Sequence, residues 1–292
     1  MKILLLGSNG QLGSAMLALS RQSKFPIGWE MVAWDRSQAD LSKVDELLPK
    51  IEAFAPDAII NSTAYTQVDL AEKEQELCEK VNAEAPTKIA ALCARKKIPI
   101  IHFSTDYVYS GEGTEPHVES EKTNPVNFYG ASKARGEEGI AASGADHLIF
   151  RTSWVFNETG KNFVNTMLRL GADRDELKVV GDQYGAPTYA HDLALYSLDA
   201  FMIGLEKKVD QKFPSGIYHL CNSGVTTWCD FAKAILPGKK IHSIPSSEFP
   251  TPAKRPSNSR MSLEKFKKTF GIEPRSWDQA LNECLNNKGI HR

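Results

Sequence analysis

Three glycines near the start of the chain constrain its fold most, because they follow directly on an apolar run. Residues 2–6 (KILLL) have the length and composition of a buried β-strand, and GSNGQLG comes next at residues 7–13. The first glycine permits a tight turn after the strand, and the last one lets a following helix pack closely against it. The chain therefore begins with a predicted strand, turn and helix, the opening of a βαβ fold.

Short apolar runs alternate with longer segments of helical period through the first half of the chain. This alternation is typical of a parallel sheet covered by helices. We predict strands at 2–6, 30–34, 58–61, 98–104 and 147–151, and helices at 11–22, 42–54, 72–97 and 129–142. In the less regular second half we predict strands at 178–180 and 217–220, and helices near 191–201, 228–236 and 276–286.

The predicted fold class is α/β, with a Rossmann-like doubly wound parallel sheet and a smaller, mixed α/β lobe toward the C-terminus. At 292 residues the chain is long enough for both units. We assign residues 1–153 and about 188–222 to the sheet domain, and residues 154–187 and 223–292 to the lobe. Four prolines between residues 245 and 256 indicate an ordered, extended loop within that lobe.

The glycine turn also predicts a ligand. Its second glycine lets the backbone approach a pyrophosphate, and the free N–H groups at the helix N-terminus attract the anion. The turn therefore indicates a dinucleotide site. The residues expected to contact the cofactor here are Gly7, Asn9, Gly10, Gln11, Leu12 and Gly13.

Two residues after the second predicted strand bear on the choice of cofactor. Asp35 lies where a carboxylate accepts a hydrogen bond from the ribose 2′-hydroxyl of NADH. Arg36, beside it, is suited to pair with the 2′-phosphate of NADPH. The sequence leaves NADPH and NADH open, and use of both is compatible with it.

The segment around residue 129 predicts the chemistry. Tyr129 and Lys133 are four apart on a predicted helix and therefore share a face. An ammonium near a phenol favours the ionised phenol and lowers its pKa, which makes Tyr129 a usable proton donor. Ser104 and Thr105 end a buried strand, at the sheet edge where ligands bind. We expect Thr105 to bind a substrate carbonyl oxygen.

The order and spacing of these motifs resemble the short-chain dehydrogenase/reductases, and the glycine spacing resembles their extended form. That superfamily usually contacts adenine at the place of Asp40 and Leu41, and passes the cofactor ribose at Thr63, Ala64 and Tyr65. The alternative for each of these segments is a helix cap or a strand end.

Within the superfamily, the chain resembles the dTDP-4-dehydrorhamnose reductases over nearly its whole length. The resemblance is carried by residues 104–109 (STDYVY), 127–133 (NFYGASK) with Gly136 and Glu137, 151–156 (RTSWVF), 182–188 (DQYGAPT) and 255–260 (RPSNSR). It implies reduction of the 4-keto group of dTDP-4-dehydro-β-L-rhamnose to dTDP-L-rhamnose, a precursor of cell-surface polysaccharide.

The same resemblance implies a role for each site residue. Tyr129 would donate the proton, Lys133 would tune Tyr129 and hold the nicotinamide ribose, and Thr105 would bind the oxygen. The substrate-binding residues it implies are Ser104, Thr105, Trp154, Arg255, Asn258 and Arg260. Core packing is the alternative for Trp154, and stabilisation of the loop is the alternative for the two arginines.

Some family members bind Mg²⁺ through acidic side chains at a dimer interface, one of them early in the first helix. Here residues 14–18 (SAMLA) hold no carboxylate, so we expect no metal, and the chain is predicted to be a monomer or a homodimer. Five scattered cysteines without a C-x-x-C pair favour free thiols in a reducing cytoplasm.

The net charge of −1, from 35 basic and 36 acidic residues, argues against nucleic acid as a partner. No apolar run has the length of a membrane span, and no secretory signal is recognisable at the start, so neither membrane insertion nor export is expected.

Two other functions stay open at this point. One is an extended short-chain epimerase or dehydratase for another nucleotide sugar, although dehydratases place an acidic pair after the threonine and this chain has only Asp106. The other is a non-catalytic regulatory subunit such as the β subunit of methionine adenosyltransferase, which resembles the family. The complete set of Thr105, Tyr129 and Lys133 argues against the second.

Overall fold

The computed structural model describes residues 1–22, 25–210 and 212–291. Its centre is a parallel six-stranded sheet with the strand order β10-β5-β4-β3-β1-β2. The strands are β1 (Lys2–Leu6), β2 (Glu30–Trp34), β3 (Ala58–Asn61), β4 (Ile100–Thr105), β5 (His147–Thr152) and β10 (Gly216–His219). The order reverses between β1 and β3, as in a doubly wound sheet. The predicted fold class is confirmed.

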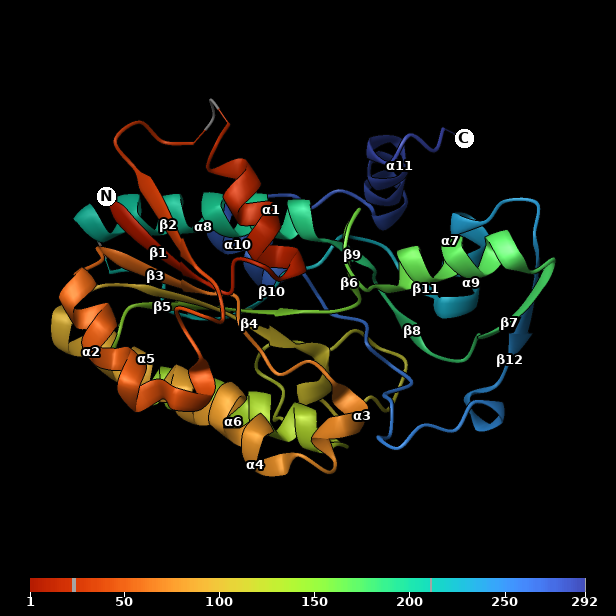
Figure 1. Cartoon of the computed structure of the whole chain (residues 1–292), viewed down its shortest axis with the longest axis horizontal. Coiled ribbons are helices and arrows are strands. Elements are labelled where there is room, and N and C mark those ends of the chain that lie inside the picture. Colours follow the sequence, from red (N-terminus) through yellow and green to blue (C-terminus); the bar gives the residue numbers. More distant parts are fainter. Residues whose placement is uncertain (23–24, 211, 292) are drawn as a thin grey trace.

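Helices cover both faces of this sheet, as Figure 1 shows. One layer contains α1 (Gln11–Leu19), α8 (Ala190–Asp210) and α10 (Glu264–Phe270), and the other contains α2 (Val44–Phe54), α5 (Ala85–Lys96) and α6 (Phe128–Ala142). Strand β1 shows why both layers are needed. Ile3 and Leu5 belong to the core under α1 and α8, while Leu4 and Leu6 belong to the core under α2 and α5.

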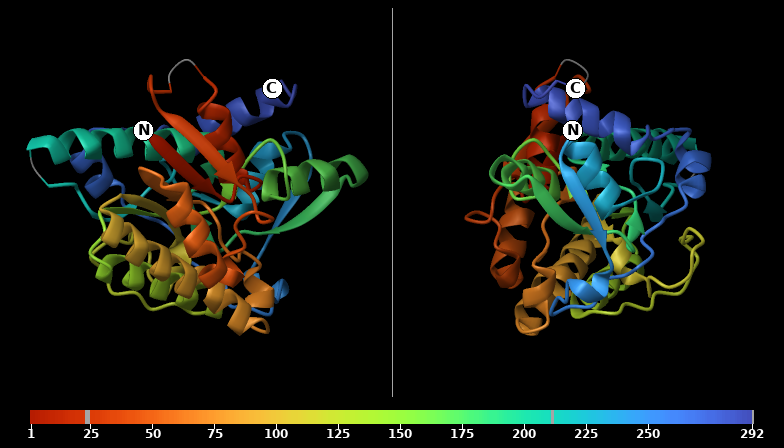
Figure 2. Two further views of the ribbon diagram at one scale, coloured as in Figure 1. Left: turned by 60° about the vertical axis from the view of Figure 1, so that its left-hand side comes forward. Right: turned by 90° about the vertical axis from the view of Figure 1, so that its right-hand side faces the viewer.

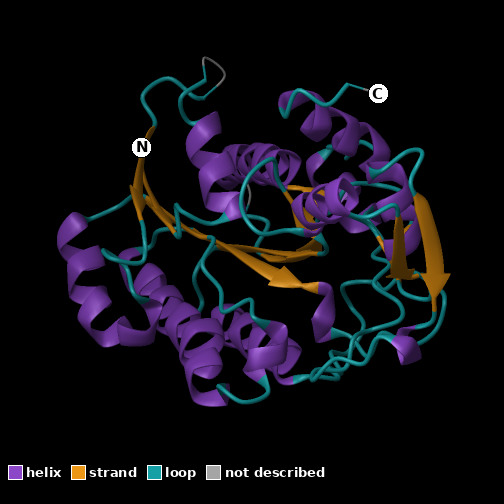
Figure 3. Ribbon diagram, turned by 45° about the vertical axis from the view of Figure 1, so that its right-hand side comes forward, coloured by secondary structure: helices purple, strands orange, loops and turns teal. Residues whose placement is uncertain are grey.

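The second half of the chain adds three two-stranded pairs around a separate apolar core. They are β6 (Val155–Phe156) with β9 (Thr188–Tyr189), β7 (Glu176–Val180) with β12 (Lys240–Ile244), and β8 (Tyr184–Gly185) with β11 (Thr226–Thr227). The side view in Figure 2 shows β7 and β12 next to each other. Helices α7 (Phe163–Asp173), α9 (Trp228–Ile235) and α11 (Trp277–Asn287) pack around these pairs. In Figure 3, loops collect between these strand pairs and the central sheet.

Segments from distant parts of the chain build the central sheet and its helix layers. Strand β10 and helix α8, from the segment assigned to residues 188–222, join the central sheet and its upper helix layer. Helix α10, from a segment assigned to the lobe, also packs there, since Phe266 and Phe270 belong to the core of that layer.

The predicted helix at 72–97 is interrupted in the structure. After α3 (Val68–Ala71), the chain forms α4 (Gln75–Glu79), a π-helical turn at Lys80–Glu84 and then α5. Within the π turn, the Asn82 amide accepts from the Tyr65 backbone N–H at 2.8 Å and donates to the Tyr65 carbonyl at 3.1 Å. These bonds fix the turn to the segment that follows β3, and π turns often mark functional sites.

Strand β12 and helices α7 and α10 were not predicted. Strand β12 and helix α10 pack against segments distant in the sequence, so local pattern gave little signal for them. Helix α7 did carry a local signal that was missed, because Asn162 caps it and its buried residues share one face. Among the described helices, none is both long and apolar enough to cross a bilayer.

Candidate active site

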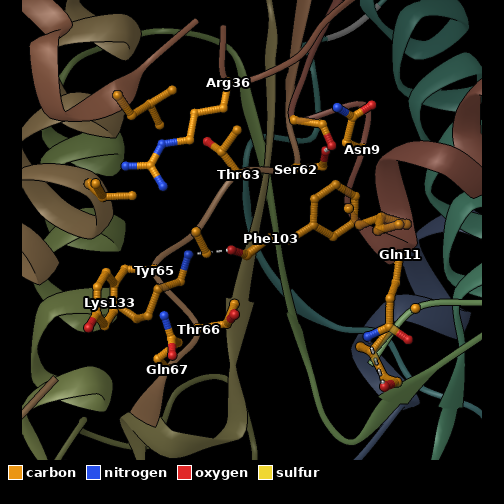
Figure 4. A pocket seen from close by; sticks show the side chains of 18 of the residues that line it. Asn9, Gln11, Arg36, Ser62, Thr63, Tyr65, Thr66, Gln67, Phe103 and Lys133 are labelled. Atoms are coloured by element: carbon orange, nitrogen blue, oxygen red, sulfur yellow. Dashed lines mark hydrogen bonds between the residues drawn. The ribbon is translucent and has the colours of Figure 1, made fainter. Parts of the chain in front are cut away.

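A cavity of about 810 Å³ opens at the carboxyl ends of the central strands. This is the edge at which open α/β sheets bind ligands. Residues that follow β1, β2 and β3 line it, together with residues at the ends of β4 and β5, residues of α6 and the loop at 159–161. Figure 4 shows side chains from both sides of the sheet turned toward this space.

The glycine turn forms the backbone cradle at one end of the cavity. Gly7 has a φ of +88°, which L residues rarely adopt. A Cβ on Gly13 would lie 2.1 Å from the Gly7 carbonyl oxygen, so only glycine allows this approach of α1 to the turn. Gly10 caps α1 and has no side chain to bind the first N–H groups of the helix. These N–H groups therefore remain available for a phosphate.

Asp35 and Arg36, the two residues that bear on cofactor choice, have different surroundings in the structure. Asp35 Oδ1 accepts from the Ser37 hydroxyl at 2.6 Å and from its N–H at 2.9 Å, and Oδ2 accepts from Asn9 at 3.2 Å. The bonds from Ser37 lower the pKa of Asp35. Arg36 lines the cavity with a side chain that is 80% exposed, and its nearest anion is Asp40 at 4.0 Å. Figure 4 shows its guanidinium beside the cavity.

Most of the other predicted cofactor residues line the same cavity. They are Gly7, Asn9, Gly10, Gln11, Leu12, Asp40, Leu41, Thr63, Ala64, Tyr65, Tyr129 and Lys133. Asp40 lines the cavity and also forms the cap considered for it from the sequence, because its Oδ1 accepts from the Ser42 N–H at 3.0 Å at the start of the turn at Leu41–Lys43. The structure does not bring Asp35 and Gly13 to the cavity wall; Gly13 shapes the turn from behind.

Lys133 is fully buried and held by two groups of β4. Its Nζ donates to the Phe103 carbonyl at 2.6 Å and lies 3.0 Å from His102 Nε2. Figure 4 shows the bond to Phe103. Burial lowers the pKa of Lys133 to about 8, although Glu137 raises it. Burial also keeps the pKa of His102 well below its usual value.

The pKa of Tyr129 differs from the sequence prediction. Burial raises it, with a further increase from the charge of Asp106, while a hydrogen bond with Thr105 acts in the opposite direction. The expected lowering by Lys133 is wrong for this structure, because the ammonium is bonded to Phe103 instead. Tyr129 therefore holds its proton firmly before reaction.

Hydroxyl groups of adjoining strands meet at the chemical end of the cavity. Ser104 and Thr152 line it, and among the described residues Ser104 Oγ and Thr152 Oγ1 have no hydrogen-bond partner although they are buried. Thr152 is the register partner of Thr105 in the neighbouring strand. Buried polar atoms without partners are rare and call for an explanation, and a bound ligand supplies one. Sequence reasoning missed Thr152, whose signal was its place at the end of a predicted strand.

The predicted substrate residues of the second half lie outside the cavity wall. Trp154 has a φ of +49° and stacks on Trp228 with ring centroids 3.7 Å apart. Arg255 pairs with Asp69 at 2.8 Å. Asn258 is buried and donates to the Glu115 carbonyl at 2.9 Å.

Arg260 lies with its guanidinium 4.3 Å from the centre of the Tyr184 ring, and it donates to Asn258 Oδ1 at 3.0 Å. Arg255, Asn258 and Arg260 thus brace the loop at 250–262 in this structure. This is the alternative considered for the two arginines from the sequence.

Comparison with known proteins identifies the family. The family model described as "RmlD substrate binding domain" matches residues 1–290. The dTDP-4-dehydrorhamnose reductase of Burkholderia thailandensis is 41% identical over 98% of this chain and 99% of its own length. The reductase of Escherichia coli K12 is 38% identical over 98% and 97%. The chain belongs to the dTDP-4-dehydrorhamnose reductase family.

Solved structures of the family agree with the fold. A dTDP-4-dehydrorhamnose reductase from Clostridium acetobutylicum superimposes with a TM-score of 0.91 at 34% identity, covering 99% of this chain and 100% of the other. The reductase from Bacillus anthracis, solved in complex with NADP, gives 0.87 at 31% identity, covering 98% and 99%. The UDP-glucose 4-epimerase from Brucella ovis, at 18% identity and a TM-score of 0.77, shows the fold alone.

Membership of the reductase family confirms the resemblance predicted from the sequence. In the described part of this reductase, no group of three or more His, Cys, Asp or Glu side chains is arranged to hold a metal ion. All five cysteines are buried free thiols, as expected.

Proposed function

We propose that this chain reduces the 4-keto group of dTDP-4-dehydro-β-L-rhamnose to give dTDP-L-rhamnose, with NADPH or NADH as the reductant. The carrying observation is that Tyr129 and Lys133 line the same cavity as the glycine turn, at the end of the strand that carries Ser104 and Thr105. Family membership supplies the substrate class.

The residues present fit a dinucleotide. The N–H groups of the glycine turn suit its diphosphate, and the unpartnered Ser104 and Thr152 hydroxyls suit polar groups of the nicotinamide end or of the sugar. When bound, the reduced nicotinamide supplies a hydride to the carbonyl carbon.

Tyr129 has the complementary task of donating its phenolic proton to the carbonyl oxygen. Its raised pKa keeps the proton in place until negative charge develops on that oxygen. The Phe103 carbonyl holds the Lys133 ammonium in place. Lys133 in turn positions Tyr129 and the nicotinamide ribose. Thr105 contacts Tyr129 and would bind the substrate oxygen, while its own buried side chain is not part of the cavity wall.

For the cofactor, we propose that NADPH is preferred while NADH is accepted. Arg36 has no closer anion than Asp40 among the described residues and is suited to the 2′-phosphate. The Asp35 carboxylate already accepts hydrogen bonds from Ser37 and Asn9, so it is less available to accept one from a ribose 2′-hydroxyl. Replacing Arg36 with Ala should raise the KM for NADPH about tenfold and leave that for NADH nearly unchanged. An equal change for both cofactors would contradict this assignment.

We further propose that the enzyme works in the cytoplasm as a monomer or homodimer without a bridging metal, and that residues 154–187 and 223–292 form the lobe that receives the dTDP-sugar. Trp154, Arg255, Asn258 and Arg260 lie in this lobe, so their contact with substrate requires its sugar or diphosphate to reach beyond the cavity described above.

The test is a reduction assay. The purified chain is given dTDP-4-keto-6-deoxyhexose produced in situ by the upstream dehydratase and epimerase, with NADPH or NADH, and loss of nicotinamide absorbance is followed. We expect stoichiometric consumption of cofactor and formation of dTDP-L-rhamnose. Interconversion of sugars without net cofactor use would favour an epimerase instead, since such an enzyme regenerates its bound NAD in each cycle.

A further inference from the structure

A buried chain of three side chains connects the catalytic strand to the loop of the second half. Thr105 Oγ1 donates to Asp106 Oδ1 at 2.9 Å, and Ser259 Oγ donates to Asp106 Oδ2 at 2.5 Å. All three residues are buried. Ser259 is fixed in turn by its backbone N–H, which donates to the Tyr184 carbonyl at 2.7 Å. Asp106 is therefore the point at which the loop at 250–262 meets the end of β4.

This arrangement determines what the Thr105 hydroxyl can offer. A hydroxyl has one proton and two acceptor positions. Here the proton goes to Asp106, and one acceptor position takes the Tyr107 N–H at 3.2 Å. With Asp106 ionised, Thr105 therefore has no proton to give to a ketone oxygen, which can only accept.

A proton on Asp106 reverses this relation. The carboxyl O–H then donates to Thr105 Oγ1, and the Thr105 proton becomes free to point at the substrate oxygen. Two donors, Tyr129 and Thr105, then face the oxygen on which negative charge develops, as the reduction of a ketone requires. The alcohol product, in contrast, has its own proton to donate and suits Thr105 as an acceptor.

The surroundings of Asp106 bring this proton into the working range. Burial raises the pKa of Asp106 to about 6, and the bonds from Ser259 and Thr105 and the His117 ring reduce the increase. The other titratable groups that sense its charge are Tyr107 on the same turn, Tyr129 on α6 and Cys221 after β10. None of these three favours the carboxylate, since each is an acid whose own ionisation would repel it.

We propose that Asp106 and Ser259 are positioning residues of the reductase: the carboxyl group of Asp106 sets whether Thr105 donates or accepts at the substrate oxygen, and Ser259 links this choice to the loop of the substrate lobe. The inference rests on the proposed role of Thr105. It adds that the protonation of Asp106 determines whether Thr105 donates or accepts, which the spacing of the catalytic residues does not reveal.

The experiment measures kcat for ketone reduction from pH 5 to 8.5 with saturating NADPH. The full-length chain is compared with Asp106→Asn, Ser259→Ala and the matched control Ser257→Ala, whose hydroxyl donates to the Gly111 carbonyl from the same loop. Thermal unfolding and NADPH affinity are recorded for each variant to establish that it is folded and loaded.

In the unmodified chain, we expect kcat to fall about tenfold as pH rises through the pKa of Asp106, because the Thr105 donor is withdrawn. Asp106→Asn should abolish this fall, since an amide does not ionise. Ser259→Ala should move it to higher pH, because the lost bond stabilises the carboxylate. Ser257→Ala should leave its position unchanged.

The proposal is overturned if the unmodified chain lacks the fall, if Asp106→Asn retains it, or if Ser259→Ala leaves its midpoint where it was. Should Asp106→Asn not fold, the comparison of Ser259→Ala with Ser257→Ala decides alone. A purely structural role would lower kcat by the same factor at every pH. Absence of reduction at all pH values would instead refute the proposed function.

Discussion

The two halves of the molecule hold their functional groups in different ways. On the cofactor side, backbone geometry and backbone groups hold the site: Gly7 and Gly13 shape the turn, and the Phe103 carbonyl fixes Lys133. On the substrate side, side chains brace an irregular loop, as Asn258 and Ser259 do. A site built from regular strands tolerates change outside a few positions, whereas a loop depends on each polar contact that replaces a regular hydrogen-bond ladder.

The largest expected effect concerns the proton donor on the cofactor side. Tyr129→Phe keeps the ring and its edge-on contact with Tyr107 but removes the proton. We expect kcat to fall by about 10²–10⁴-fold, the contribution of a positioned general acid. Steady-state kinetics with both cofactors measure this, and cofactor fluorescence should show nearly unchanged NADPH affinity. Near-normal turnover would refute the assignment of Tyr129.

The next effect concerns the core of the same half. Glu137 on α6 and Arg151 on β5 form a buried pair, with Nη2 2.5 Å from Oε2. Replacing Glu137 with Gln leaves the guanidinium without its counter-charge, which should lower the free energy of unfolding by about 3–5 kcal/mol. Urea unfolding measures the change.

Glu76→Gln is the matched control, because Glu76 pairs with Lys80 on the surface and its side chain is 84% exposed. Its loss should cost less than about 0.5 kcal/mol. Equal losses in the free energy of unfolding would show that the buried pair contributes no more to stability than the exposed pair.

The difference between the halves also explains what the sequence could predict. Alternating apolar runs identified every strand of the central sheet, because the inner strands β1, β3, β4 and β5 are almost completely buried and the partly exposed edge strands β2 and β10 keep short apolar runs. The spacing of Tyr129 and Lys133 places them on one helix face whatever surrounds them. In contrast, β7 finds its partner β12 only through the tertiary fold.

The same limit applies to single site residues. Asp106 and Ser259 are far apart in the sequence, and no local pattern links a serine in a proline-rich loop to a carboxylate behind the catalytic threonine. Likewise, nothing in the spacing of Tyr129 and Lys133 shows that the Phe103 carbonyl takes the ammonium. Sequence reasoning therefore named most of the groups that line the cavity, but it missed Thr152 and could not show that the residues of the loop at 250–262 lie outside the cavity wall. The direction of each hydrogen bond also required the structure.

A third prediction tests the backbone cradle. Gly13→Ala places a Cβ against the Gly7 carbonyl and must displace the turn, whereas a Cβ on Gly10 would lie an ordinary 3.4 Å from the same oxygen. We expect Gly13→Ala to weaken NADPH binding by about 30–100-fold, corresponding to roughly 2–3 kcal/mol of overpacking. Gly10→Ala should have a clearly smaller effect. Titration of cofactor fluorescence measures both, and a reversed order would contradict the geometry of the turn.

The smallest effect separates bracing from substrate contact on the other side. Asn258 donates to the Glu115 carbonyl and accepts from the Arg260 N–H at 3.2 Å, so Asn258→Ala leaves buried polar groups unpaired. We expect a loss of about 1–2 kcal/mol in unfolding free energy. If Asn258 only braces the loop, the KM for the dTDP-sugar should rise in step with that of Ser257→Ala, which also loses a bond to this loop. A KM increase confined to Asn258→Ala, without loss of stability, would instead indicate direct contact with the substrate. It would show that the loop binds ligand directly, which would reduce the contrast between the two halves.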